Sequence, residues 1–383
     1  MTAVPLHHVV DGPDDAPVVL MLGSLGSTGR MWDPQVPALA GPYRVVRADA
    51  RGHGRSPVLP GPYVLDDLVD DTLALLDRLG VQRASIVGLS LGGMTAMRLA
   101  ARAPERVDRL AVLCTSALLG PAQNWTDRAA AVRAGGSGAV ASAVVERWFT
   151  PGLRAADPAL VADMEEMVAG IPAEGYAACC EAIATMDLRE DLARITAPTL
   201  AIAGADDPAT PPEHLAAIAD AVPGARLLVL PSAAHLASIE QAPAVNAALL
   251  LHLAADPSDA DRRRGGMAVR RGVLGDAHVD RAVASTTPLT APFQDFITRY
   301  AWGDVWSRPG LDRRTRSLLT LALLTALGHE HELGMHVRAA ITNGVTPEEI
   351  GEVLLHSAVY AGVPAANRML AVAHTVLAEL GLD

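Results

Sequence analysis

Short apolar runs alternate with amphipathic helical patterns throughout residues 1–253. Continuous apolar runs of this kind are typical of buried parallel strands, and their alternation with helices predicts a mainly parallel sheet covered by helices on both faces. We therefore assign this region to the α/β class. The runs that we expect to form strands are residues 18–22, 44–49, 84–88, 110–114, 199–203 and 226–230.

The alternation is interrupted at about residues 120–194. This segment carries Trp125, Trp148 and Tyr176, and its apolar positions follow a helical period without a strand pattern. Because predicted strands precede and follow the segment, we expect it to form a helical cap over one end of the sheet.

A domain boundary is expected near residue 254. Residues 254–266 are polar and rich in turn-forming residues, which is typical of a linker. Residues 267–383 show only helical periodicity, with helix-capping signals at Asp312 and Thr346. The sequence therefore predicts a second, all-helical domain after the linker.

The composition excludes several functional classes. All 31 basic residues are arginine, so a Schiff-base lysine and the lysine of a Walker phosphate loop are both absent. The net charge of −12, without an extended basic tract, argues against nucleic acid as a partner. No apolar run is long enough to span a bilayer, so we expect no membrane partner either.

The first residues and the cysteines bear on the compartment. Residues 1–8 lack the basic start and the long apolar segment of a signal peptide. Cys114, Cys179 and Cys180 form neither a Cys-x-x-Cys pair nor a disulfide framework. We therefore expect a cytoplasmic protein without a redox dithiol or a zinc ribbon.

A candidate nucleophile lies at residues 88–92 (Gly-Leu-Ser-Leu-Gly), which follow a predicted strand and precede a predicted helix. This is the context of a nucleophile elbow, where glycines permit a sharp turn that exposes the central serine. The alternative is a turn rich in glycine and serine that has no catalytic function. The context favours Ser90 as a nucleophile.

A serine nucleophile needs a base and an acid that orients the base. Asp206 and Asp207 follow the predicted strand 199–203, and His235 follows the predicted strand 226–230. The aspartates could merely cap a helix and His235 could be a buried structural histidine. Together with Ser90 they occur in the chain order serine, aspartate, histidine, which predicts a catalytic triad.

Acyl transfer also requires donors for the oxyanion that develops. The backbone N–H of Leu91, directly after the serine, can supply one donor. The loop at residues 23–26 follows the first predicted strand, so we expect the N–H of Leu25 to be the second, although the loop could be only a tight turn.

These motifs, together with residues 49–56 (Asp-Ala-Arg-Gly-His-Gly-Arg-Ser), resemble the α/β-hydrolase superfamily over nearly all of residues 1–253. The resemblance implies an α/β-hydrolase fold and places the acid at Asp207. A serine at the elbow, instead of an aspartate, distinguishes the chain from haloalkane dehalogenases and epoxide hydrolases.

Within the superfamily, residues 22–27, 31–33 and 146–151 look like 3-oxoadipate enol-lactone hydrolases. Gly23 departs from these relatives, which often carry histidine or asparagine there, but the departure leaves the backbone donor intact. The resemblance implies a substrate with a carboxylate. The cap residues that could contact this substrate are Arg128, Arg133, Arg147 and Trp148, although core packing is an alternative for the tryptophan.

Residues 329–336 of the second domain (His-Glu-His-Glu-Leu-Gly-Met-His) concentrate ionisable groups on a predicted helix. His329, Glu332 and His336 are spaced to share one face, which could bind a metal, perform acid–base chemistry or be solvated. The spacing differs from the His-Glu-x-x-His metal motif, so we assign no metal. Alkylhydroperoxidase-like proteins carry Cys-x-x-Cys here, and its absence excludes their thiol chemistry.

Residues 267–383 resemble 4-carboxymuconolactone decarboxylase, through residues 270–275, 301–311, 314–317 and 363–367. The resemblance implies decarboxylation without a cofactor, because the unsaturated lactone can itself delocalise the electrons left by carbon dioxide. Glu332 and His336 suit proton delivery, and His329 could contact the substrate. Arg314 or Arg316 could bind its carboxylates, with a solvated helix face as the alternative.

The two resemblances reinforce each other, because the product of the decarboxylase would be the substrate of the hydrolase. They imply a bifunctional enzyme of protocatechuate breakdown that acts on small carboxylated lactones. One alternative is a general carboxylesterase fused to a non-catalytic helical oligomerisation module, and another is a non-catalytic binding protein with a hydrolase fold. Because decarboxylase relatives assemble through their helices, we expect a homo-oligomer.

Overall fold

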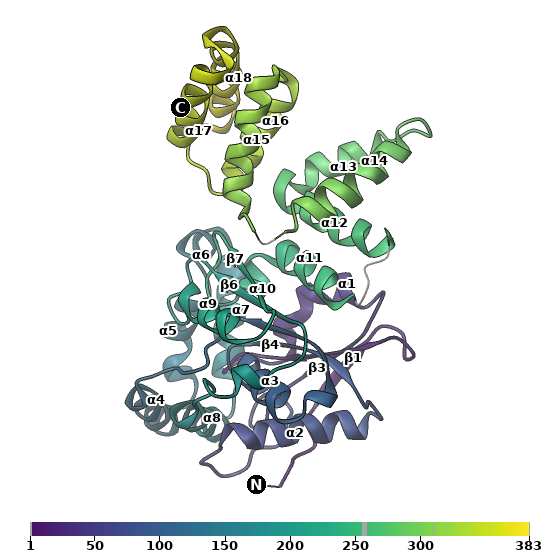
Figure 1. Ribbon diagram of the computed structural model, residues 1–383. Helices are drawn as coiled ribbons and strands as arrows, with labels where there is room; N and C mark the ends of the chain where they lie inside the picture. Colours follow the sequence, from purple (N-terminus) through teal and green to yellow (C-terminus); the bar gives the residue numbers. More distant parts are fainter. Residues whose placement is uncertain (1, 255–258, 309, 383) are drawn as a thin grey trace. The chain divides into compact units, whose positions relative to one another are not determined.

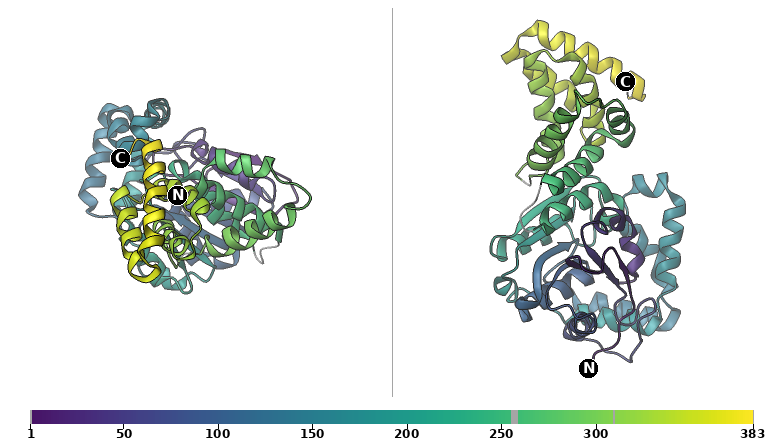
Figure 2. Two further views of the ribbon diagram at one scale, coloured as in Figure 1. Left: turned by 90° about the horizontal axis from the view of Figure 1, so that it is seen from above. Right: turned by 90° about the vertical axis from the view of Figure 1, so that its right-hand side faces the viewer.

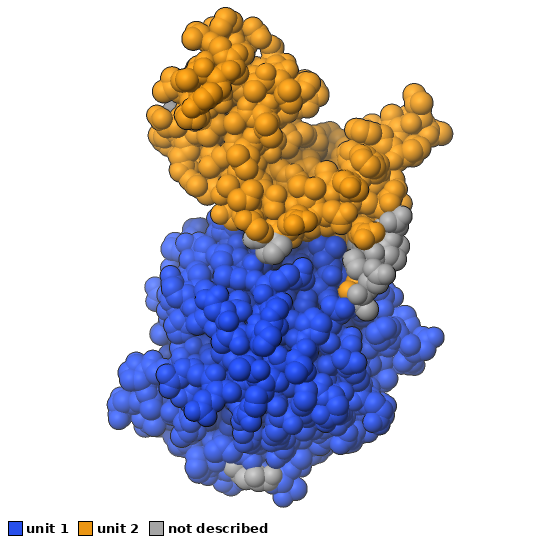
Figure 3. Space-filling view, viewed as in Figure 1, with its two compact units in different colours: residues 1–253 blue, residues 254–383 orange. Residues whose placement is uncertain are grey.

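The computed structural model describes residues 2–254, 259–308 and 310–382. The chain divides into two compact units, Met1–Leu253 and Ala254–Asp383 (Figure 3). The first unit is built around a sheet, whereas the described part of the second unit contains helices and no strand. Within the described residues, no helix combines the length and apolar character needed to cross a membrane.

Seven strands form one sheet in the first unit, in the spatial order β1-β3-β2-β4-β5-β6-β7 (Figure 1). The predicted strands are all present and run parallel to one another, which confirms the α/β class. The sequence pattern missed the antiparallel edge strand β1, because its half-exposed residues form no apolar run. The strands are β1 (His8–Asp11), β2 (Val18–Leu22), β3 (Arg44–Ala48), β4 (Ala84–Leu89), β5 (Val107–Leu113), β6 (Thr199–Gly204) and β7 (Arg226–Leu230).

Helices cover both faces of this sheet. Helices α2, α3 and α9 pack on one face, and α1 and α11 pack on the other. All residues of the inner strands β4 and β6 are buried, so the core lies between these two helical layers. The helices are α1 (Val36–Leu39), α2 (Leu65–Arg78), α3 (Leu91–Arg102), α9 (Pro212–Ala221), α10 (Ala237–Glu240) and α11 (Ala242–Leu253).

The segment between β5 and β6 forms the helical cap expected for residues 120–194. Within it, α4 packs against α8 and α5 packs against α7. Thr150 and Asp157 accept hydrogen bonds from backbone N–H groups and so cap the starts of α6 and α7. The cap helices are α4 (Ala122–Gly135), α5 (Gly138–Trp148), α6 (Pro151–Ala156), α7 (Pro158–Ala169) and α8 (Ala173–Thr185).

The second unit is helical, as expected (Figure 2). The carboxylate of Asp312 accepts from the N–H of Thr315 and starts α15, while Thr346 and Glu349 form a capping box at the start of α17. The helices are α12 (Asp259–Leu274), α13 (Asp276–Ala284), α14 (Ala291–Ile297), the π-helix Thr298–Val305, α15 (Arg313–Leu327), α16 (Glu330–Thr342), α17 (Pro347–Ala361) and α18 (Val363–Leu380).

The linker expected at residues 254–266 requires a correction, because helix α12 already begins at Asp259. Residues 255–258 lie outside the described residues. Gly266, at the end of the expected linker, and Gly303, in the π-helix, permit close packing between helices. A Cβ on Gly266 would lie 2.0 Å from the carbonyl oxygen of Thr298, and a Cβ on Gly303 would lie 2.6 Å from that of Arg262. Both glycines thus let α12 approach the π-helix closely.

Candidate active sites

Ser90 occupies the sharp turn between β4 and α3. Its backbone angles are φ 55° and ψ −117°, a conformation that side-chain-bearing residues rarely adopt. A Cβ on Gly88 would lie 2.3 Å from the carbonyl oxygen of Gly92, and one on Gly92 would lie 2.2 Å from that of Leu22. The Thr115 hydroxyl donates to the Ser90 carbonyl over 2.7 Å. The turn therefore has the steric demands expected of a nucleophile elbow.

Asp207 and His235 meet at the carboxyl ends of β6 and β7. Nδ1 of His235 lies 2.9 Å from Oδ2 of Asp207, and this oxygen also accepts from the Thr210 hydroxyl over 2.7 Å. Burial alone would raise the pKa of Asp207. The charge and hydrogen bond of His235, helped by Thr210, instead lower this pKa to about 2. Asp207 is therefore an anion at neutral pH and can orient the imidazole.

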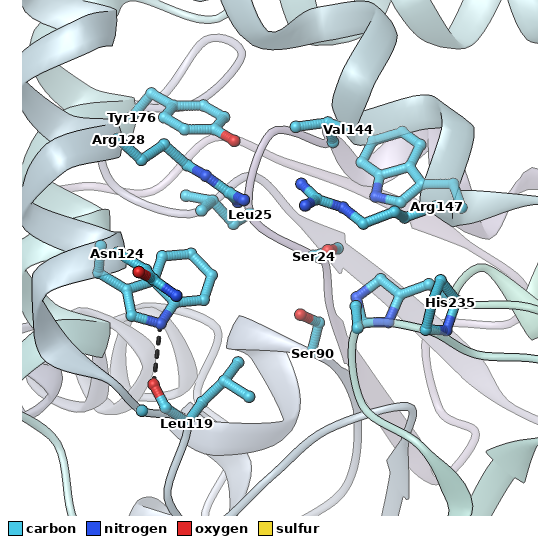
Figure 4. Close-up of a pocket in the computed structure, with 15 residues that line it drawn as sticks. Ser24, Leu25, Ser90, Leu119, Asn124, Arg128, Val144, Arg147, Tyr176 and His235 are labelled. Carbon is cyan, nitrogen blue, oxygen red and sulfur yellow. Dashed lines mark hydrogen bonds between the residues drawn. The ribbon is translucent and has the colours of Figure 1, made fainter.

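Ser90 and His235 line the same cavity, which has a volume of about 210 Å³ (Figure 4). Both side chains are buried beneath the cap. Asp207 lies outside the lining, behind His235. The fold thus brings the three expected residues to one end of the sheet, with the serine and the imidazole facing a space that could hold a small ester.

The two expected oxyanion donors lie next to this serine. Leu25 lines the cavity, and Leu91 is the first residue of α3. Neither backbone N–H has a hydrogen-bond acceptor within residues 2–254. The loop and the elbow are joined by the N–H of Gly92, which donates to the carbonyl oxygen of Gly23 over 3.0 Å. Both N–H groups are therefore available to an oxyanion.

Two cap arginines bring positive charge to the cavity. Arg128 and Arg147 both line it, and their guanidinium groups point toward each other in Figure 4. In the part of the chain that the structure describes, neither has an acidic partner within ion-pair distance. Burial and the neighbouring Arg128 lower the pKa of Arg147. The Arg128 guanidinium lies 4.8 Å from the Trp125 ring centroid, and Trp148 forms another part of the wall.

The third cap arginine does not take part, so the expectation for Arg133 is wrong. Its guanidinium donates to Glu174 over 2.8 Å and to Glu181 over 2.5 Å, outside the cavity lining. Two carboxylates already neutralise it. The sequence analysis also missed Asn124 and Tyr176 as lining residues. The sequence shows that Asn124 is polar and Tyr176 aromatic, but a helical period alone does not show which face of a cap helix lies toward Ser90.

Glu332 and His336 lie one turn apart on α16 of the second unit. Burial and the nearby His278 lower the pKa of His336 to about 4, although Glu332 acts in the opposite direction. His329 is the N-cap residue of this helix and is exposed. Among the described residues, no three His, Cys, Asp or Glu side chains converge as a metal site would require.

The two arginines expected to bind substrate in this unit are occupied elsewhere. Arg314 forms an ion pair with Glu349. Arg316 donates to the backbone carbonyl oxygens of Leu311 and Arg308 over 3.1 and 2.9 Å. Helical spacing does not reveal local partners of this kind, and a role of either arginine in substrate binding stays a prediction.

The neighbouring Arg313, which the sequence analysis passed over, has no such partner among the described residues. Its side chain is half-buried, and burial lowers its pKa to about 10. A Cβ on Gly272 of α12 would lie 2.9 Å from its Nη1 atom, so the guanidinium packs against α12. An unpaired guanidinium in such surroundings is a candidate receptor for a carboxylate.

Two protein-family models match the chain. Residues 17–242 match the model described as the alpha/beta hydrolase fold, and residues 291–375 match the carboxymuconolactone decarboxylase family. These matches fall on the two compact units, one on each.

Individual relatives show the same division. The chain is 39% identical over 246 residues to 3-oxoadipate enol-lactonase 2 of Acinetobacter baylyi, covering 64% of this chain and 92% of the relative. It is 50% identical over 125 residues to 4-carboxymuconolactone decarboxylase of the same organism, covering 33% and 93%. The crystal structure of the enol-lactonase from Burkholderia xenovorans matches with a TM-score of 0.64 and 39% identity, covering 65% of this chain and 96% of that one.

Proposed function

Because this chain belongs to the α/β-hydrolase fold family through its first unit and to the carboxymuconolactone decarboxylase family through its second, we propose that it is a bifunctional enzyme of protocatechuate breakdown. The second unit converts 4-carboxymuconolactone into 3-oxoadipate enol-lactone and carbon dioxide. The first unit hydrolyses the enol-lactone to 3-oxoadipate. The observation that carries the proposal is the union, in one chain, of units similar to enzymes whose reactions follow one another.

Lactone hydrolysis begins with attack of the Ser90 hydroxyl on the lactone carbonyl, while His235 takes the hydroxyl proton and Asp207 stabilises the resulting imidazolium. The N–H groups of Leu25 and Leu91 stabilise the oxyanion. Collapse breaks the ring C–O bond, and the enol that leaves takes the proton from His235 and tautomerises to the ketone. Water then attacks the acyl-enzyme with His235 as base, which releases the second carboxylate and restores Ser90.

Arg128 and Arg147 bind the carboxylate that the enol-lactone carries on its side chain. Two unpaired guanidiniums facing the nucleophile favour an anionic substrate over a neutral ester of similar size. Trp148 walls the cavity beside them. This arrangement supports a carboxylated lactone more than it supports a general carboxylesterase.

In the decarboxylation, the breaking C–C bond leaves its electron pair on the conjugated lactone and releases carbon dioxide, and a proton then adds to the dienolate. Glu332 and His336 deliver this proton. His336 is neutral at neutral pH, given its lowered pKa, and a neutral imidazole can still donate its N–H hydrogen to a developing enolate. Arg313, in place of Arg314 and Arg316, binds a substrate carboxylate.

The helical unit also serves self-association. It exposes large apolar side chains on several helices, which isolated globular units rarely do to this extent. A second copy of the chain is the partner that we propose, and its existence would be tested by measuring the mass in solution. Examples are Phe293, Phe296, Leu323, Leu327, Val359 and Tyr360, which are all more than half exposed.

We place the enzyme in the cytoplasm. Its three cysteines, Cys114, Cys179 and Cys180, are buried and free, which fits a reducing compartment. Its proposed substrates are small organic anions.

The decisive experiment supplies the carboxylated lactone and measures both carbon dioxide and 3-oxoadipate. The wild-type chain should release both. Ser90→Ala should release carbon dioxide and accumulate the enol-lactone, whereas Glu332→Ala should release none but still hydrolyse added enol-lactone. A wild-type chain that hydrolyses the enol-lactone but releases no carbon dioxide would instead support a non-catalytic helical module. Failure of a serine-directed fluorophosphonate to label Ser90 would support a binding protein.

A further inference from the structure

The hydroxyl of Tyr176 is a buried polar group that the proposed mechanism does not use. Tyr176 lies on α8, and its side chain is completely buried. Its hydroxyl makes no hydrogen bond of normal length and angle among the described residues, although the Arg128 guanidinium lies near it and Tyr176 lines the cavity that contains Ser90. A buried hydroxyl without a partner is unfavourable, so a ligand that supplies an acceptor would be bound more tightly.

The position of Tyr176 is fixed by two close approaches between the cap and the body of the first unit. A Cβ on Gly175 would lie 2.1 Å from the carbonyl oxygen of Gly52, so the two backbones are in direct contact. The Tyr176 ring stacks on the imidazole of His53, with 6.4 Å between ring centroids and 25° between planes. The ring therefore has little freedom to turn its hydroxyl away from the cavity.

The same ring supports the loop that carries an oxyanion donor. A Cβ on Gly26 would lie 3.0 Å from Cε2 of Tyr176, so the ring edge packs against this residue. The Gly26 N–H in turn donates to Nε2 of His53 over 3.0 Å. Tyr176 thus contacts the residue next to Leu25 as well as the substrate cavity.

The surroundings of the hydroxyl are cationic. In Figure 4 it lies on the same side of the cavity as the guanidinium groups of Arg128 and Arg147, and the residues that line this cavity include no aspartate or glutamate. Burial raises the pKa of Tyr176 to about 12, and the two guanidiniums only partly oppose this shift. The hydroxyl therefore remains protonated at neutral pH and can act as a donor.

We propose that Tyr176 is a substrate-binding residue whose hydroxyl donates a hydrogen bond to the carboxylate held by Arg128 and Arg147. This inference rests on the proposed function only in requiring an anionic ester. The site then consists of two guanidinium groups and one neutral hydroxyl donor. The hydroxyl helps to orient the carboxylate without adding charge. The ring that carries this donor also packs against Gly26, so one side chain contacts both the anion site and the oxyanion loop.

The test uses two esters that differ only at the far end of the acyl chain. The mono-p-nitrophenyl ester of glutaric acid carries a distal carboxylate, and p-nitrophenyl valerate carries a methyl group there. For Tyr176→Phe, the ratio of kcat/KM for the half-ester to that for the valerate should fall by roughly tenfold to a hundredfold. The change should arise mainly from KM for the half-ester, because the lost hydrogen bond belongs to the non-reacting end.

Tyr63→Phe is the matched control. Tyr63 is equally buried, but its hydroxyl donates to the Leu59 carbonyl oxygen over 2.6 Å and lies outside the cavity lining. Its removal should leave the ratio for the two esters unchanged. An unchanged ratio in Tyr176→Phe would overturn the proposal. Equal losses on both esters would assign the hydroxyl a purely structural role, and no loss on either ester would assign it none.

The half-ester assay also separates this inference from the proposed function. If the wild-type chain fails to hydrolyse the enol-lactone but Tyr176→Phe still loses discrimination for the half-ester, the anion site is retained and the proposed substrate is wrong. If the wild-type chain hydrolyses the enol-lactone and the ratio for Tyr176→Phe is unchanged, the assignment of Tyr176 is wrong and the proposed reaction stands.

Discussion

The two units hold their ionisable groups in different ways. In the first unit, the carboxylate of Asp207 is already in contact with His235, whereas Arg128 and Arg147, which line the cavity, have no ion pair among the described residues. In the second unit, neither His336 nor Arg313 has an acid in hydrogen-bond contact within residues 259–308 and 310–382. The first site is thus assembled before the substrate arrives, whereas the second needs the substrate to supply its negative charge. Loss of Asp207 should therefore impair chemistry in the first unit, whereas loss of Arg313 should mainly impair binding in the second.

The largest effect is expected for Asp207→Asn. The amide cannot stabilise an imidazolium and holds His235 in the wrong tautomer, so kcat for lactone hydrolysis should fall by about 10⁴-fold. Carbon dioxide release should be unaffected, because the decarboxylase residues lie in the other unit. Steady-state assays of both steps on the same preparation measure the difference. A parallel loss of both activities would contradict the independence of the two sites.

A smaller but still large effect is expected for Arg147→Gln. Removing one charged donor from the cavity should raise KM for the enol-lactone by roughly 10- to 100-fold. Arg133→Gln serves as control, because Glu174 and Glu181 already occupy that guanidinium. Equal effects of the two substitutions would mean that total positive charge of the cap, and not contact with the substrate, sets KM.

In the second unit, Arg313→Gln should lower kcat/KM for decarboxylation by about tenfold, because one carboxylate loses a charged partner. Arg314→Gln offers an adjacent comparison, since Glu349 already pairs with that side chain. It should change kcat/KM by less than about twofold, as expected for the loss of an exposed ion pair. Carbon dioxide release from both variants measures the effect, and the reverse ranking would restore Arg314 as the substrate ligand.

The smallest effect concerns the stability of the first unit at acid pH. Burial and Arg226 lower the pKa of His252 to about 4. Its ring is satisfied only when neutral, because Nδ1 accepts from the Arg226 guanidinium over 3.3 Å while Nε2 donates to the Leu110 carbonyl oxygen over 2.9 Å. The unfolded chain therefore binds a proton first, so stability falls as pH drops from about 6.5 to about 4. At pH 5 the loss should be about 1–2 kcal/mol from this residue.

Urea unfolding at pH 7 and pH 5 measures that loss, with His252→Gln as the comparison. The amide can replace both hydrogen bonds of the ring but takes up no proton in this range. The variant should therefore lose less stability than the wild type between the two pH values. An identical loss in both would show that other groups account for the acid sensitivity.

The same contrast explains how far sequence reasoning reached. Parallel strands end at one edge of a sheet, so Asp207 and His235 could be placed near Ser90 from their order along the chain alone. For the candidate residues on helices, the sequence showed only that they recur at a helical period. That period placed Glu332 and His336 one turn apart on one helix, but it could not show that Glu349 would neutralise Arg314 or that Glu174 would neutralise Arg133. Partners chosen by packing between helices leave no local signal in the sequence.

The backbone contact between Gly52 and Gly175 has a consequence for engineering. Exchanging caps between related hydrolases is an attractive route to new specificities. In this enzyme, a cap taken from a relative with any residue larger than glycine at position 175 would be held away from the rest of the first unit. The ring of the neighbouring tyrosine would move with it. Chimeras that keep both glycines should retain ester hydrolysis. Chimeras that change either glycine should fold but should bind their substrates out of line with Ser90.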